Sequence, residues 1–108
     1  MSTTFDDREK SYEKKFAHDA ELKFKAESRR NKALAEWAGA KMALTGAALD
    51  DYIKAVRKAD LEEKGDDDVF RKVKSDLQAK GLQIADADIR MVMSEALAKA
   101  VTDIEAGK

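Results

Sequence analysis

The sequence predicts an all-α protein, a small four-helix bundle with a flexible N-terminal arm that becomes helical when bound. Three observations predict this class. The chain of 108 residues is 44% hydrophobic and 40% charged, as is typical of a helical protein with one modest core. It has no proline. Three of its five glycines, Gly46, Gly65 and Gly81, separate segments whose apolar residues recur every three or four positions. We therefore expect an arm at residues 1–18 and a helical bundle at residues 19–108.

The arm is defined by aromatic side chains in a highly charged segment. Phe5, Tyr12, Phe16 and Phe24 follow one another at steps of seven, four and eight residues, so on a helix they share one slowly drifting face. Ser and Thr residues at positions 2–4 favour a helix start there. So narrow a stripe does not stabilise a helix alone, and we expect it to lie in a groove of another protein.

The same face becomes polar beyond Phe24, where Glu27, Ser28 and Asn31 occupy the positions that would continue the stripe. A helix that packs on the bundle over its full length should not be polar there, so the change indicates a boundary between a free arm and a folded domain. The alternative is that the aromatic side chains of the arm fold back onto the bundle as ordinary core.

The first two helices of the bundle are expected at about residues 19–45 and 48–63. The first contains Gly39, which the neighbouring alanines mark as a point of close helix packing rather than a hinge. We expect Gly46 to end the first helix and Gly65 to end the second.

The third and fourth helices each follow aspartates. Asp66–Asp68 provide a cap and an acidic first turn for the third helix, which should end at Gly81. Asp86 or Asp88 is the expected cap of the fourth helix. Its apolar face is the cleanest in the chain and consists of Ile89, Val92, Met93, Ala96, Leu97, Ala100, Val101 and Ile104.

Composition excludes several classes of function. The formal net charge of −1 provides no global field for nucleic acid or an anionic membrane. The absence of cysteine rules out disulfides, thiolate metal sites and a cysteine nucleophile. We find neither a signal peptide nor a spanning segment, and no glycine-rich phosphate loop. A cytoplasmic protein that is not an enzyme is therefore expected.

The remaining candidates for chemistry have simpler interpretations. His18 could act as a pH switch, but it has no second His or Cys and fits a solvated helix face. Asp66–Asp68 lack the ligand spacing of a calcium loop and fit a helix start, so no metal site is predicted. Arg29, Arg30 and Lys32 could meet a phosphate, but they too fit a solvated face.

The opening residues also carry a family resemblance. The stretch from Thr4 to Lys10, continued by Tyr12, Lys14, Lys15 and Phe16, and the later segment at residues 33–38 resemble the alphaproteobacterial F-type ATP synthase zeta subunit, the ATPase inhibitor subunit zeta family. The similarity extends over essentially the whole chain and is strongest in its N-terminal half.

The resemblance implies a protein inhibitor of the catalytic head of the F-type ATP synthase. It implies that the N-terminal segment inserts at a catalytic subunit interface and blocks ATP hydrolysis. The protein would then lie at the inner face of the membrane through that enzyme. The residues expected to bind the partner are Phe5, Arg8, Tyr12, Lys14, Lys15 and Phe16. Weak adenine-nucleotide (ATP or ADP) binding is implied by the family alone. The alternatives left open are a nucleotide-sensing bundle and a helical adaptor for another partner.

Overall fold

Four helices make up the part of the chain that the computed structural model describes, which is residues 20–61 and 66–107. They are α2 (Ala20–Lys41), α3 (Gly46–Asp60), α4 (Asp67–Ala79) and α5 (Asp86–Glu105). The expectation of an all-α bundle of four helices is confirmed. The expected arm at residues 1–18 lies outside the described residues.

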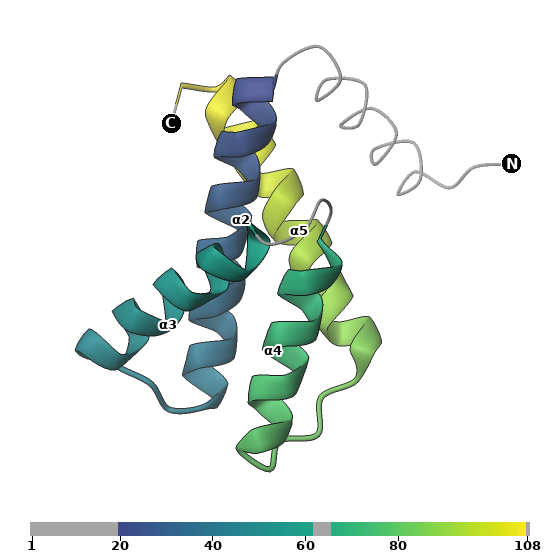
Figure 1. Ribbon diagram of the computed structural model, residues 1–108. Helices are drawn as coiled ribbons and strands as arrows, with labels where there is room; N and C mark the ends of the chain where they lie inside the picture. The colour runs from purple at the N-terminus through teal and green to yellow at the C-terminus, as the bar shows by residue number, and fades with distance from the viewer. Residues whose placement is uncertain (1–19, 62–65, 108) are drawn as a thin grey trace, which may run out of the picture.

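The helices run alternately up and down, with α2 and α5 as the longest pair (Figure 1). These two lie side by side up to the end of the molecule that holds the C-terminus. The shorter helices α3 and α4 flank only the opposite part of this pair (Figure 1). The first turns of α2 are therefore accompanied by α5 alone among the four helices.

The core has two parts. All four helices contribute to the larger cluster, whose buried members are Leu34, Ala35, Ala38, Ile53, Val56, Val69, Val73, Leu77, Ile89 and Met93. A smaller cluster joins α2 to α5 through Ala26, Ala100 and Val101. Because these residues recur at helical spacing, the predicted apolar face of α5 is confirmed, with Ile89, Met93, Ala100 and Val101 fully buried.

Gly39 is a point of close packing, as predicted. A Cβ atom built on Gly39 would lie 2.6 Å from Cδ1 of Leu49, a residue of the next helix. A larger residue at this position would therefore force Leu49 to move.

The end of α2 differs from the prediction. The helix ends at Lys41, and Ala43, not Gly46, takes the left-handed conformation that closes it, with φ of +60°. The Leu44 N–H donates to the Gly39 carbonyl at 2.8 Å, which is the six-to-one bond of a Schellman motif. Gly46 also has positive φ, but it begins α3 instead of ending α2.

Gly81 closes α4 as predicted. Its φ is +76°, its N–H donates to the Gln78 carbonyl at 2.9 Å, and the Leu82 N–H donates to the Leu77 carbonyl at 3.0 Å. This is a second Schellman motif, here with the residue that adopts the left-handed region at least cost. The expected glycine stop at Gly65 lies outside the described residues.

The prediction that aspartate side chains cap the third and fourth predicted helices is wrong. Asp66 occupies the N-cap position of α4, but its side chain makes no capping hydrogen bond. The N-cap of α5 is Ala85, so Asp86 and Asp88 lie within the first turn. They still stabilise the positive end of the helix dipole from there, while the Asp66 carboxylate is used for a contact between helices.

Candidate functional site

The sequence-predicted partner-binding residues all lie outside the described residues, as does His18. They are Phe5, Arg8, Tyr12, Lys14, Lys15 and Phe16. Of the aromatic stripe the structure describes Phe24, whose side chain is 66% exposed on the second turn of α2.

Part of the polar stretch after Phe24 is buried, contrary to the sequence-based interpretation. Asn31 is 2% exposed and Arg30 is 4% exposed, so α2 does pack on the bundle where it was expected to face solvent. The prediction that Arg29, Arg30 and Lys32 form a solvated basic cluster is wrong for Arg30. These polar residues of α2 are buried because they bond to a residue of another helix. Their polarity therefore does not mark a boundary of the domain.

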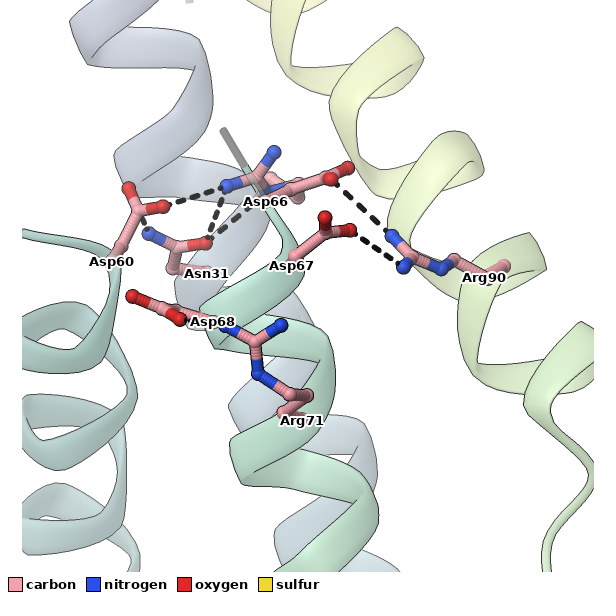
Figure 2. A network of polar contacts seen from close by, with 8 residues as sticks. Asn31, Asp60, Asp66, Asp67, Asp68, Arg71 and Arg90 are labelled. Atoms are coloured by element: carbon pink, nitrogen blue, oxygen red, sulfur yellow. Dashed lines mark hydrogen bonds and ion pairs between the residues drawn. The ribbon is translucent and has the colours of Figure 1, made fainter. Parts of the chain in front are cut away.

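That partner is Asp60, at the end of α3. Nη2 of Arg30 donates to Oδ1 of Asp60 at 3.3 Å, and Nδ2 of Asn31 donates to Oδ2 of the same carboxylate at 3.0 Å. The Arg30 guanidinium also donates to Oδ1 of Asn31, through Nε at 3.1 Å and Nη2 at 3.0 Å. Figure 2 shows Asn31 and Asp60 facing each other between the two helices. We call these three residues the buried triad.

The buried triad satisfies groups that would otherwise be costly to enclose. A buried guanidinium needs an opposite charge and hydrogen-bond acceptors, and here it has both. The Asn31 amide uses its oxygen toward Arg30 and its nitrogen toward Asp60. This arrangement fixes the end of α3 against the middle of α2.

A second arginine holds the start of α4. Arg90 of α5 donates to Oδ1 of Asp66 at 3.2 Å and to Oδ1 of Asp67 at 2.9 Å (Figure 2). Its guanidinium carbon lies 4.0 Å from the centre of the Phe70 ring, so the charge also stacks on an aromatic face. The third aspartate of the run, Asp68, pairs with Arg71 of its own helix. Two arginines thus hold the two ends of the α3–α4 connection.

Sequence reasoning missed these pairs because each joins residues far apart in the chain. Asp60 lies 30 residues from Arg30, and Arg90 lies 24 from Asp66. The one available signal was two adjacent polar residues, Arg30 and Asn31, one turn before the apolar pair Leu34 and Ala35.

Glu27 lies one turn before the buried triad and is half-buried. Burial raises the pKa of Glu27 above its ordinary value of 4.5; Arg30 opposes the rise and Asp60 reinforces it. Lys23 also lowers the pKa of Glu27 and Asp66 also raises it, both more weakly. The carboxylate form of Glu27 is therefore unfavourable in this environment.

Tyr52 is the other perturbed group. Its hydroxyl is enclosed without a hydrogen-bond partner of good geometry in the described part of the chain, although Asp76 lies close to it. Burial, together with the Asp76 carboxylate, raises the pKa of Tyr52. A phenol kept neutral in this way is a structural group at physiological pH.

An open depression between α3 and α4 is lined by Ala55, Lys58, Ala59, Asp68 and Lys72. The polar side chains of its lining are two lysines and one aspartate. Within residues 20–61 and 66–107, no group of three His, Cys, Asp or Glu side chains could hold a metal ion. No helix in these ranges is long and apolar enough to cross a membrane.

The fold and its polar contacts thus define a small helical bundle in which Arg30 and Arg90 pair with aspartates of neighbouring helices. A family model described as ATPase inhibitor subunit zeta matches residues 1–103. The chain belongs to this family, as the resemblance of its opening residues indicated. No curated protein was found to match it.

Proposed function

We propose that this protein inhibits ATP hydrolysis by the catalytic head of an F-type ATP synthase and that residues 1–18 are the inhibitory segment. The observation that carries the proposal is the family match, which covers the opening segment together with the bundle. The segment would bind as a helix at an interface between catalytic and non-catalytic subunits.

The four described helices bury one another's apolar faces. Their buried apolar residues run from Ala26 to Val101 and form two clusters among α2, α3, α4 and α5. We propose that this bundle carries the inhibitory segment and that the aromatic residues before position 20 bind the other protein.

The proposed segment has residues suited to a protein interface. Phe5, Tyr12 and Phe16 would be the apolar anchors, because a few buried aromatic side chains supply most of the affinity of such contacts. Arg8 and either Lys14 or Lys15 would pair with carboxylates of the enzyme.

Inhibition of this kind requires no chemistry by the inhibitor, so we propose that the protein is not an enzyme. The bound segment would hold one conformational state of a rotary enzyme. Its effect then depends on binding that state more tightly than the others.

Deleting residues 2–16 tests the proposal. ATP hydrolysis by the cognate enzyme is measured with increasing amounts of full-length or truncated protein. We expect inhibition by the full chain and none by the truncated one, whose bundle remains folded by circular dichroism. Equal inhibition by both would refute the assignment of the segment, and no inhibition by either would refute the function.

The second candidate function is adenine-nucleotide sensing, and the depression between α3 and α4 is the observation that favours it. Lys58 and Lys72 line it and could bind phosphate oxygens. Titration of ATP into the protein, followed by NMR, would show shifts around these lysines that Lys58→Ala removes. A sensor should keep this binding when residues 2–16 are deleted.

A further inference from the structure

The first turns of α2 present an uncovered face that contains Phe24. Ala26 faces α5 and is fully buried with Ala100 and Val101. Phe24 precedes Ala26 by two residues, which is about 200° around a helix, so it lies on the side away from this contact. Its 66% exposure agrees with that position.

The third helix ends too early to cover this face. Phe24 precedes Asn31 by seven residues, so the two side chains point in nearly the same direction about 10 Å apart along the axis. Asn31 is covered because it bonds to Asp60, the last residue of α3. Phe24 lies two turns beyond that end, where Figure 1 shows α2 accompanied by α5 and not by α3.

On this face the polar amide of Asn31 is buried, whereas the large apolar ring of Phe24 is exposed to solvent. Single exposed apolar residues are common on protein surfaces, and Leu61 and Met91 are also exposed. Phe24 differs from both because it continues the spacing of Phe5, Tyr12 and Phe16. It is the one member of that stripe that lies on a described helix of the bundle.

Charges of both signs surround this position, because Glu21 and Glu27 lie one turn before and after Phe24. Lys23 and Lys25 flank Phe24, and Lys32 is exposed further along α2. Lys25 bonds to Glu21 at 2.9 Å and Lys23 approaches Glu27 at 3.9 Å. Such exposed pairs contribute little stability, so these lysines can exchange partners at low cost. An apolar site for the ring, beside carboxylates that can replace Glu21 and Glu27 as partners of these lysines, would bind this surface.

We propose that Phe24, Lys23 and Lys25 extend the contact with the inhibited enzyme from the N-terminal segment onto the folded bundle. This rests on the proposed function. The occupant is a protein surface of the ATP synthase head with an apolar site for the Phe24 ring and carboxylates beside it. Because α2 is already helical here, these contacts require less ordering of the chain than those of a segment that folds on binding.

The test uses the full chain with Phe24→Ala and compares it with Met91→Ala, which removes an exposed apolar side chain from α5. Both variants should keep the wild-type helicity and melting temperature. We expect Phe24→Ala to raise the concentration for half-maximal ATPase inhibition about tenfold or more, and Met91→Ala to leave it unchanged. Lys23→Glu with Lys25→Glu should also weaken inhibition, with the largest effect at low salt.

The outcomes separate the two proposals. If the wild-type protein does not inhibit the enzyme, the proposed function fails. If it does inhibit and Phe24→Ala inhibits equally well, the extended contact is refuted and the proposed function stands. Sedimentation analysis tests whether a second copy of the chain binds this face instead. A wild-type dimer that Phe24→Ala converts to a monomer would overturn the proposal.

Discussion

At the scale of single residues, the buried triad explains why polar side chains interrupt the apolar pattern of α2. Arg30 and Asn31 occupy core positions because Asp60 reaches them from α3. Their contacts are directional and involve a charge, so they fix the crossing of α2 and α3 in a way that apolar packing alone does not.

Asp60→Ala should therefore be strongly destabilising. It leaves the buried Arg30 guanidinium without its carboxylate, and loss of one partner of a buried ion pair costs about 3–5 kcal/mol. The matched control is Glu21→Ala, which breaks the exposed pair with Lys25 and should change the free energy of unfolding by less than about 0.5 kcal/mol. Urea denaturation of both variants measures this, and equal effects would contradict a structural role for the triad.

Glu27 makes the free energy of unfolding fall as the pH rises. Its pKa is raised in the folded protein, so its contribution is fully present below the ordinary value of 4.5 and is lost as pH rises through the folded pKa. Glu27→Gln should then be more stable than wild type at pH 7, with the advantage disappearing below about pH 4.5. Thermal melts across this range measure the difference, with Glu36→Gln as an exposed control on the same helix. A constant difference at all pH values would show that burial of the charge is unimportant.

The proposed role of the aromatic side chains in the N-terminal segment leads to a separate prediction. If Phe5 and Tyr12 are anchors, replacing both with Ala should weaken binding to the ATP synthase head by several kcal/mol. Ser11→Ala lies in the same segment but outside the stripe and should have no such effect. Titration calorimetry with the isolated head measures both, and unchanged binding by the double variant would refute these anchors.

At the scale of the helices, the two Schellman motifs use different residues for the same geometry. Gly81 adopts positive φ without steric cost, whereas Ala43 at +60° brings its Cβ close to the backbone. The α2–α3 turn is therefore strained where the α4–α5 turn is not. Nearby, Gly39 allows Leu49 to approach α2 closely, so this end of α2 is determined by both backbone conformation and packing.

Ala43→Gly should stabilise the protein by about 1 kcal/mol, because glycine relieves the left-handed strain. The same substitution at Ala33, an exposed position inside α2, should destabilise it by about 1 kcal/mol. The opposite signs come from the backbone conformation, since both side chains are exposed methyl groups. Chemical denaturation of the two variants tests this, and destabilisation by Ala43→Gly would contradict a strained turn.

At the scale of the whole molecule, the two arginine contacts and the buried core clusters of the described residues lie within residues 26–101. We propose that inhibition is the task of the segment that precedes them. The exposed Phe24 lies where these two parts meet.

If residues 1–18 are a separate inhibitory segment, removing residues 2–16 should leave the free energy of unfolding within about 0.5 kcal/mol of the full chain. Thermal and urea unfolding of both proteins measure this. A loss of several kcal/mol would show that Phe5, Tyr12 or Phe16 packs in the bundle, and the separation of segment from domain would be wrong.

The sequence by itself determined the helical class, the number of helices, the apolar face of α5, the close packing at Gly39 and the stop at Gly81. These features depend on residues within a few positions of one another, because helical periodicity and capping are local. The family resemblance was also carried by consecutive residues, and the match over residues 1–103 confirms it.

Only the tertiary structure decided which polar residues are buried and which large apolar residues are exposed. Asp60 bonds to Arg30 because α3 ends beside the middle of α2. Asp66 and Asp67 bond to Arg90 because α4 begins beside α5. Phe24 stays in solvent because α3 stops two turns short of it. The lengths and crossings of four packed helices set these outcomes, and no local pattern in the chain encodes them.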